Sequence, residues 1–453
     1  MRKSILAVTT ALTIGGLTGA AFAQTAPTNP LISGAPPLLF APYGPSGAPS
    51  NGNEPGTVQS YVRGRLYFDA AIMSDSADKL AGRSAPYSMG EAARIFWGFA
   101  GTAASGLNYG AYIEVRQNAG GVSAVANTGT ATLIMRREQG YVSGKWGALR
   151  FGITDDPMAL FMTGLFENGD AMWNGDLGGL VHGATVPNWP FAENSGGYGN
   201  TKVVYLSPRW NGFDFGLSFQ PSMSGSGYPD ATATRTTSLN SGTFIGSAGA
   251  TGLARARNQI IAEGRYGTEI GPVGIVGTFG IATAGTVKNG GLTGTTVQGG
   301  AQYSYRNVLA FDAGAQLKYG GFAFGGHLVT GAINPNGANN LLPVKQGSGS
   351  TTAFVVGASY AVGSWGFSTA YWNSLTPGAY SEDFAGPGTF GKRKETGMNV
   401  EATYGYAPGA SISLTYEYGS RHQAGYNFYT ASRSTAGNNT KAQGLILTNY
   451  FQW

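Results

Sequence analysis

The sequence predicts an all-β protein: an antiparallel transmembrane β-barrel of about sixteen strands. Three observations lead to this fold class. Apolar and polar residues alternate with a period of two from Val58 onward, which is typical of strands with two different faces. Tight turns and long loops connect the predicted strands in alternation, and the chain ends on an aromatic residue, Trp453, in an alternating segment. Barrels that cross membranes combine short turns on one side with longer loops on the other.

The composition excludes several other classes. The chain has 453 residues, of which 42% are hydrophobic, 12% aromatic and 11% charged, whereas soluble domains are roughly 25% charged. A mean hydropathy of −0.09 cannot supply the several apolar runs that a polytopic helical membrane protein needs. Cysteine is absent, which excludes a disulfide scaffold. The aromatic content argues against a disordered chain, and we expect no nucleic-acid partner because such proteins cluster Lys and Arg.

Residues 1–23 have the features of a secretory signal peptide. Arg2 and Lys3 supply the positive end, residues 5–17 the apolar core, and Ala21-Phe22-Ala23 a small-x-small cleavage site. The alternative is an N-terminal membrane anchor, which the short apolar core disfavours.

Residues 24–56 form a proline-rich arm ahead of the predicted barrel domain at 57–453. Eight of them are proline and one, Glu54, is charged. Proline at this density prevents both helix formation and strand pairing, so we predict an extended periplasmic arm. A tether to the cell wall and a partial plug are the alternatives.

The first predicted strand shows the alternation clearly. One face carries Val58, Val62, Leu66, Phe68, Ala70 and Ile72, and the other carries Tyr61, Arg63, Arg65, Tyr67 and Asp69. Residues 107–116, 213–220 and 309–319 alternate in the same way. Soluble sandwiches alternate too, so the connections must decide between the two folds.

The connections favour the barrel. Tight turns are predicted at 105–106, 145–146, 271–272, 320–321, 363–364 and 408–409, and long loops near 73–90, 118–130, 155–199, 222–254, 283–307, 331–350, 373–394 and 419–440. Pro208 and Gly212 make one further turn. Eight long loops and seven tight turns give sixteen strands, each about 9 to 12 residues long. Closure follows because an open edge in lipid leaves backbone groups unpaired, at several kcal/mol each. The second, fourth and eighth strands alternate less clearly.

Aromatic residues near the strand ends are expected to form girdles at the two membrane interfaces. They are Trp97, Tyr109, Trp146, Phe151, Trp210, Phe213, Trp365, Tyr371, Tyr404, Phe451 and Trp453.

In the last predicted strand, one face carries Leu445, Leu447, Phe451 and Trp453. This ending resembles the signal that the barrel-assembly machinery reads in outer-membrane barrels; the alternative is a chain that merely ends on a strand.

The segment 205–219 resembles a hairpin of the general porins of Gram-negative bacteria. That hairpin follows the long third loop and reads Tyr-x-Ser-Pro-x-aromatic-x-Gly-aromatic, which matches Tyr205, Ser207, Pro208, Trp210, Gly212 and Phe213. The resemblance covers 57–453, and segments 106–117 and 150–164 are similar to alphaproteobacterial members. It implies a water-filled, usually trimeric barrel of sixteen strands whose long third loop folds into the lumen. The proline-rich arm lies outside the resemblance.

The candidate constriction is the longest interruption of the alternation, residues 155–199. Its acidic residues are Asp155, Asp156, Glu167, Asp170, Asp176 and Glu193, and it contains no Lys or Arg. The polar faces of the early strands carry Arg63, Arg65, Arg94, Arg116 and Arg150. Opposed charges sort the solutes that cross a pore, so we expect a transverse field between loop and wall. Alternatively, the acids solvate a surface loop and the arginines pair with Asp69 and Glu114.

Asp156 before Pro157 fits the start of a helix, with Asp as N-cap and Pro at the first helical position. A short helix is therefore predicted over 158–166.

No catalytic, metal or cofactor site is predicted. The chain has three histidines, His182, His327 and His422, and none belongs to the Ser, His and Asn set of an outer-membrane phospholipase. We interpret all three as solvated bystanders. No Cys or His spacing indicates a metal site.

Together these features predict an outer-membrane porin for passive diffusion of ions and small hydrophilic solutes, exported with a cleaved signal peptide in a Gram-negative bacterium. The expected partners are outer-membrane lipid and lipopolysaccharide, the barrel-assembly machinery and two further copies in a homotrimer. A porin that prefers sugars or anions is the first alternative, and a secreted soluble β-protein such as an adhesin is the second. A plugged active transporter is disfavoured because the arm is too short to form a globular plug.

Overall fold

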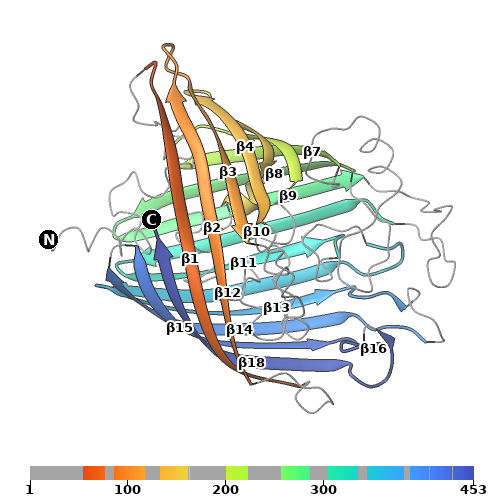
Figure 1. The fold of residues 1–453 in the computed structure, drawn as a ribbon. Helices are drawn as coiled ribbons and strands as arrows, with labels where there is room; N and C mark the ends of the chain where they lie inside the picture. The colour runs from red at the N-terminus through yellow and green to blue at the C-terminus, as the bar shows by residue number, and fades with distance from the viewer. Residues whose placement is uncertain are drawn as a thin grey trace.

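Sixteen antiparallel strands form a closed barrel in the computed structural model (Figure 1). The structure describes residues 55–76, 86–117, 133–161, 163, 200–222, 257–285, 305–334, 344–381, 388–407, 409–430 and 432–453. Each barrel strand pairs with the next one along the chain, and the first and last strands pair to close the ring. Within the described residues, the prediction of a sixteen-stranded barrel is confirmed.

The barrel strands are 7 to 18 residues long. Their bounds are β1 Val58–Asp75, β2 Tyr87–Thr102, β3 Asn108–Gln117, β4 Leu133–Gly144, β5 Gly147–Thr154, β6 Asn200–Leu206, β7 Phe213–Ser222, β8 Arg257–Ile270, β9 Val273–Gly285, β10 Val308–Tyr319, β11 Phe322–Gly331, β12 Thr351–Val362, β13 Trp365–Thr376, β14 Arg393–Ala407, β15 Ala410–His422 and β18 Asn439–Gln452.

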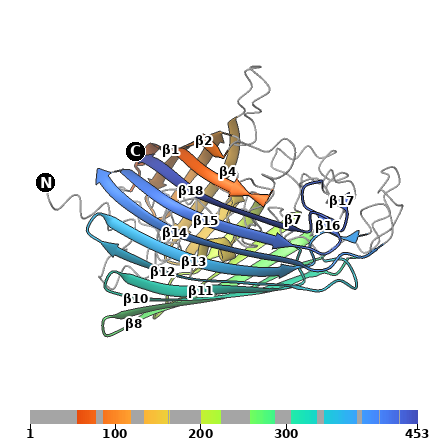
Figure 2. The same cartoon turned by 90° about the horizontal axis from the view of Figure 1, so that it is seen from below.

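Three short elements lie outside the ring of strands. The helix α2, Pro157–Phe161, follows β5, and a small hairpin of β16, Tyr426–Asn427, and β17, Ser432–Arg433, lies in the last long connection. Figure 2 shows this hairpin at the loop end of the barrel. None of the helices among the described residues has the length and apolar character needed to cross a bilayer.

The alternation along each strand separates an outer face from an inner face. On β1, Val62 is 67% exposed on the outer face, whereas Arg65 and Asp69 are buried on the inner face. β7, β10 and β18 show the same separation, with outward apolar and inward polar residues. The predicted facing of these strands is therefore confirmed. A barrel whose outer face meets lipid needs this arrangement.

Within the described residues, short turns connect consecutive strands at the predicted positions, but many strands are longer than 9 to 12 residues. Gly271, Gly320 and Gly363 adopt positive φ angles of 56° to 59°, as two-residue hairpin turns require. At the loop end of the barrel, the strands stay paired beyond the band of apolar outward residues. On β18, for example, the outward Lys441 and Gln443 are exposed. The predicted length of 9 to 12 residues counted only the part of each strand with an apolar outer face. It therefore left out the polar residues that extend the strands at the loop end.

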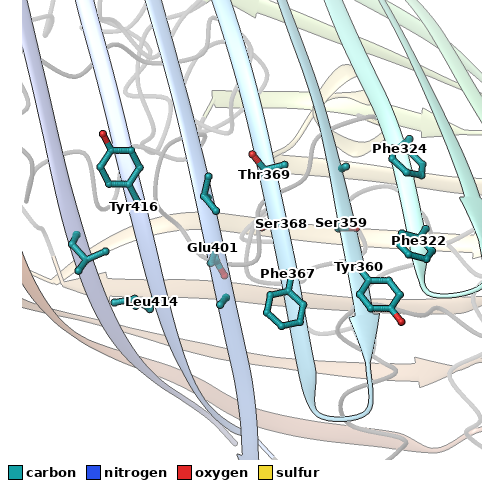
Figure 3. Close-up of a pocket in the computed structure, with 14 residues that line it drawn as sticks. Phe322, Phe324, Ser359, Tyr360, Phe367, Ser368, Thr369, Glu401, Leu414 and Tyr416 are labelled. Carbon is teal, nitrogen blue, oxygen red and sulfur yellow. The ribbon is translucent and has the colours of Figure 1, made fainter.

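Aromatic side chains gather on the outer face near the tight turns. The ring centroids of Trp146 and Tyr205 are 6.4 Å apart, and those of Trp365 and Tyr404 are 4.8 Å apart. Figure 3 shows Tyr360 and Phe367 near the turn between β12 and β13, and Phe322 at the start of the neighbouring β11. All three border a shallow apolar groove on the outer wall. This band has the position and chemistry expected of an interfacial girdle.

Candidate pore wall and constriction

Three of the predicted arginines form one row across the inner wall. Arg65 of β1 is paired with Arg94 of β2, which is paired in turn with Arg116 of β3. Residues directly opposite each other in antiparallel strands have Cα atoms about 5 Å apart. The row therefore concentrates positive charge on one side of the inner wall. We call Arg65, Arg94 and Arg116 the arginine row.

The other two predicted arginines also lie on the inner face. Arg63 precedes Arg65 by two residues and so shares its face, and it is half-buried. Arg150 of β5 is 1% exposed and is paired with Tyr141 of β4. The basic part of the inner wall thus runs from β1 to β5.

A chain of ion pairs connects this wall to the third long loop. Nη1 of Arg94 lies 3.4 Å from Oε1 of Glu114, and the other oxygen of Glu114 accepts a hydrogen bond from Nη1 of Arg137. Nε of Arg137 lies 3.1 Å from Oδ1 of Asp155. Local pairing of the arginines with Glu114, named above as an alternative, is therefore present. Asp155 stands beside the basic wall and does not face it across the lumen.

Arg137 was not predicted from the sequence because a β-bulge interrupts β4. Glu114 is paired with Arg137 and Val115 with Met135, which leaves one extra residue on β4 between them. The extra residue reverses the alternation, so a period of two assigns the wrong face to one half of the strand.

Asp156 begins the helix α2, as the sequence predicted. Its Oδ1 accepts a hydrogen bond of 3.0 Å from the backbone nitrogen of Ala159, and Pro157 occupies the first helical position. α2 ends at Phe161, before the predicted end at 166. Burial raises the pKa of Asp156, which lies outside the membrane-spanning strands, although Lys202 acts in the opposite direction.

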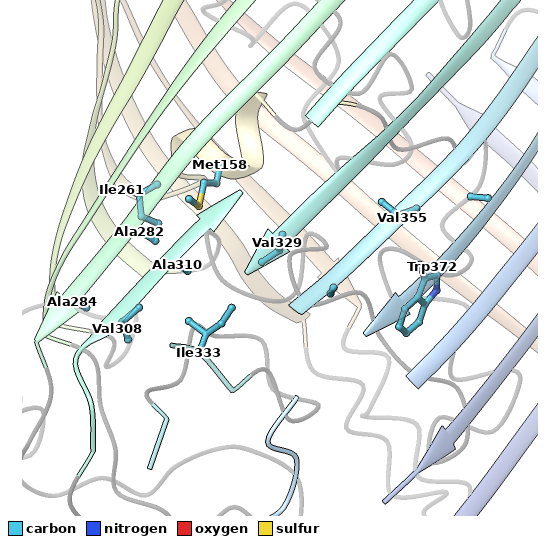
Figure 4. Packing of buried hydrophobic residues seen from close by; sticks show 12 residues of the cluster. Met158, Ile261, Ala282, Ala284, Val308, Ala310, Val329, Ile333, Val355 and Trp372 are labelled. Atoms are coloured by element: carbon cyan, nitrogen blue, oxygen red, sulfur yellow. The ribbon is translucent and has the colours of Figure 1, made fainter. Parts of the chain in front are cut away.

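α2 lies against the inner face of β7, β8 and β9. Met158 packs with Ile261 of β8 and Ala282 of β9, and Figure 4 shows it pointing toward them. A side-chain carbon built at Gly216 of β7 would lie 2.7 Å from Cβ of Pro157, so this helix fits only over a glycine. These contacts place α2 on the inner face of the barrel wall. The other predicted acids, Glu167, Asp170, Asp176 and Glu193, lie outside the described residues.

Two buried carboxylates lie on the wall that faces the arginine row. β10, which carries Asp312, is eight strands from β2 in either direction around the ring of sixteen. Asp312 and Glu263 of β8 are each 2% exposed on the inner face. Both lie close enough to interact electrostatically with each other and with Asp156. The facing negative charge thus includes wall residues, and sequence reasoning had assigned it to the loop alone.

One of the three histidines differs from the interpretation given above. His327 does lie on the inner face, but it is 3% exposed and contacts Asp312 and the backbone of Thr163, so it is not a solvated bystander. His422 is exposed and its Nδ1 lies 2.7 Å from Oδ1 of Asn439. His182 lies outside the described residues. Among the residues that the structure describes, no three His, Cys, Asp or Glu side chains are arranged to hold a metal ion.

The predicted turn motif and the last strand have specific local contacts. The hydroxyl of Tyr205 donates a hydrogen bond of 2.8 Å to the carbonyl of Trp146. Oγ of Ser207 accepts one of 2.9 Å from the backbone nitrogen of Phe215. Pro208 follows the end of β6, and Gly212, with φ 90°, precedes Phe213 at the start of β7. Trp210 and Phe213 are exposed on the outer face, as are Leu445, Leu447, Phe451 and Trp453 of the C-terminal segment.

A closed sixteen-stranded barrel with an apolar exterior and a charged interior defines the class of protein: a channel of the outer membrane. A family model described as Gram-negative porin matches residues 8–424. The chain therefore belongs to the Gram-negative porin family. It forms an outer-membrane channel for the passive diffusion of ions and small hydrophilic solutes, and its family and fold are those of a channel rather than an enzyme.

A solved structure shows the same fold. The chain is similar to an anion-selective porin from Comamonas acidovorans, with 14% identity over 88% of this chain and 100% of that chain and a TM-score of 0.53. It also resembles an OmpT loop-deletion mutant, an outer-membrane protein of Vibrio cholerae, with 13% identity, coverage of 87% and 99%, and a TM-score of 0.48. No curated protein sequence matches the chain.

Proposed function

We propose that this porin sorts solutes with a transverse electric field inside its lumen. The observation that carries the proposal is the position of the arginine row on β1 to β3, diametrically across the ring from Asp312 on β10. Glu263 and Asp156 are two further acidic groups near Asp312. The field favours small dipolar and charged solutes, which align with it, over apolar solutes, which must displace ordered water from the charged walls.

The third long loop narrows the lumen beside the acidic wall in this proposal. Support comes from α2, which packs on the inner face of β7 to β9 and carries the chain inward from β5. Asp155 contributes through its ion pair with Arg137 and fixes the start of the loop to the basic wall. Asp156 contributes charge on the opposite side of the same short segment.

The experiment is a reversal-potential measurement in a planar bilayer across a salt gradient. Arg116→Gln removes one charge from the arginine row, and Asp312→Asn removes one from the facing wall. One unit charge about 7 Å from a permeant ion in water is worth about 0.6 kcal/mol, or roughly a threefold change in permeability ratio. We expect Arg116→Gln to increase the preference for cations and Asp312→Asn to decrease it.

Lys394→Gln is the matched control, because Lys394 is exposed at the loop end of β14 and removal of its charge leaves the lumen unchanged. If Arg116→Gln and Asp312→Asn both leave the reversal potential at the wild-type value, the field proposal is wrong. A sugar- or anion-preferring porin remains the alternative. It predicts saturation of conductance or block by one solute class, which the same bilayers measure.

The protein assembles as a homotrimer through the outer face of β2 to β4. Support comes from Glu138, which is exposed on the outer face near the middle of β4, and from Glu91, which is exposed on the outer face of β2. Charged side chains on a lipid-facing wall are destabilising, most of all at mid-depth. A neighbouring subunit that covers these carboxylates separates them from lipid. Light scattering of the detergent-solubilised protein tests this assembly, and a monomer that conducts normally contradicts it.

We also propose how the signal peptide and the proline-rich arm take part in export. Export removes residues 1–23, leaves the proline-rich arm 24–56 in the periplasm, and delivers the barrel 57–453 to the assembly machinery through its C-terminal aromatic signal. The mature barrel then contacts lipid and lipopolysaccharide. N-terminal sequencing of the protein purified from outer membranes tests the cleavage, and a first residue other than Gln24 contradicts it.

A further inference from the structure

Both ends of α2 contact the inner wall of the barrel. Pro157 begins the helix over the bare backbone of Gly216 on β7, and Phe161 ends it with a side chain that is 3% exposed. A helix of 5 residues is far below the length of about 12 residues at which helices become stable on their own. The position of α2 therefore depends on what its residues contact in the wall.

The ring of Phe161 contacts two different surfaces of the wall. It packs in an apolar cluster with Ala148 of β5 and with Val204 and Leu206 of β6. It also lies against Arg265 of β8, whose guanidinium carbon is 4.2 Å from the ring centroid. Phe161 thus connects the end of α2 to three strands at once.

Asp214 of β7 holds the guanidinium group of Arg265 in place. The two residues are directly opposite each other in the antiparallel pair of β7 and β8. Nε of Arg265 donates a hydrogen bond of 3.0 Å to Oδ1 of Asp214, and Nη2 donates a second one to Oδ2. Because two parallel hydrogen bonds fix the orientation of a guanidinium group, the cation stays in place over the ring of Phe161.

Burial strengthens the attraction between the cation and the ring. Arg265 is 3% exposed and Asp214 is 5% exposed. A cation is attracted to an aromatic face more strongly when both groups are removed from water. An aliphatic side chain at position 161 would also fill the apolar cluster, but it would offer no aromatic face to Arg265. The aromatic ring at this position is therefore explained by Arg265 together with the cluster on β5 and β6.

We infer that Arg265 is a positioning residue of the channel: held by Asp214, it fixes the end of α2 through the ring of Phe161. The inference deepens the proposed function and rests on it, because in that proposal α2 carries the third long loop inward from β5. Asp214 acts on α2 by way of Arg265. The three residues therefore form one unit, in which the loss of any member releases the same end of the helix.

The mobility of a spin label on α2 tests the inference, because the chain has no cysteine and a single introduced cysteine is labelled specifically. The label is attached at Ala159→Cys in the full-length protein, since Ala159 is a partly exposed residue of the helix. Phe161→Leu keeps the apolar cluster filled and removes the aromatic face, whereas Arg265→Met removes the cation. We expect each substitution to raise the mobile fraction of the label about threefold or more.

Asp214→Asn distinguishes positioning from a merely structural role. Asn keeps the shape of the side chain but holds the guanidinium group less strongly, because it carries no charge. We expect this substitution to mobilise the label as well, although the carboxylate of Asp214 binds Arg265 and not α2. In an Arg265→Met background, Asp214→Asn should add nothing further. Additive effects of the two substitutions overturn the inference, because Asp214 would then act on α2 by another route.

Arg421→Gln is the matched control. Nε of Arg421 lies 3.1 Å from Oε1 of Glu395, so the substitution removes the cation of another ion pair between neighbouring strands, on β14 and β15. The label should remain as immobile as in the wild type. A rise in this control indicates general loosening of the barrel and overturns the inference, as does a label that is equally mobile in the wild type, Phe161→Leu and Arg265→Met. Circular dichroism and the heat-unfolding temperature confirm that each variant is folded.

The label experiment and the field proposal have separate readouts. Label mobility is measured without a salt gradient or a current, whereas the field proposal depends on the reversal potentials of Arg116→Gln and Asp312→Asn. If the label is equally mobile in all variants, those reversal potentials still test the field. If the reversal potentials do not shift, the mobility of α2 still tests the contact between Arg265 and Phe161.

Discussion

The indole of Trp453 covers Gly64 at the seam where the barrel closes. The backbone nitrogen of Gly64 donates a hydrogen bond of 3.2 Å to the carbonyl of Trp453, and the nitrogen of Trp453 returns one of 3.1 Å to the carbonyl of Gly64. A side-chain carbon at Gly64 would lie 2.1 Å from the indole ring. The last residue of the chain thus packs on the first strand, where only glycine leaves space for it.

Gly64→Ala should displace this indole and weaken the seam between β1 and β18. Overpacking at an unyielding site destabilises by about 1 to 3 kcal/mol, and the half-exposed ring can shift, so we expect the lower end of that range. The measurement is the heat-unfolding temperature in detergent. Gly277→Ala is the control, since its added carbon would find no atom closer than 3.8 Å. In a Trp453→Ala background the effect of Gly64→Ala should disappear; if it persists, the indole is not its cause.

Arg137→Met should destabilise the fold more than any other single replacement in the ion-pair chain. Arg137 is fully buried between Glu114 and Asp155, and its removal leaves two buried carboxylates without their shared cation. Breaking a buried pair in this way costs about 3 to 5 kcal/mol. Unfolding in detergent and urea measures the loss. Adding Glu114→Gln should recover part of it, and a double variant less stable than the single one contradicts this account.

The fold could be predicted from the sequence because lipid imposes a simple rule on every strand. Val62 and Phe68 point outward and Arg65 and Asp69 point inward, as a period of two requires. The rule fails where something other than water lies on the inner face. Ile261 of β8 is apolar and faces inward because Met158 of α2 packs on it. That contact is why the eighth strand alternated less clearly.

The candidate site was less predictable because it depends on contacts between distant segments. The inward arginines follow from strand alternation alone. Arg137 was missed because the bulge on β4 reverses the alternation. The pairing of His327 with Thr163 joins residues 164 positions apart, and no local pattern indicates such a contact. Charge counts alone could not reveal that Asp155 pairs with the basic wall.

Gly216→Ala should push α2 toward the lumen axis and reduce conductance. The added carbon would lie 2.7 Å from Cβ of Pro157, whose ring cannot rotate away. The helix must therefore move inward, and single-channel conductance should fall without a change in strand content. Gly277→Ala, on the outer side of β9, is again the control and should conduct as the wild type does. Unchanged conductance in Gly216→Ala would mean that α2 does not border the narrowest part of the channel.

Asp156→Asn should stabilise the folded protein at neutral pH and flatten its pH dependence. Burial raises the pKa of Asp156 above its ordinary value of 3.8, so the folded state binds this proton more tightly than the unfolded state does. The contribution is complete below 3.8 and is lost as the pH rises through the folded-state pKa. Asn keeps the cap on Ala159 and carries no charge. Unfolding temperatures at about pH 4 and about pH 8 should therefore converge in the variant. A variant that loses more stability at the higher pH would show instead that the attraction between Asp156 and Lys202 outweighs the cost of burial.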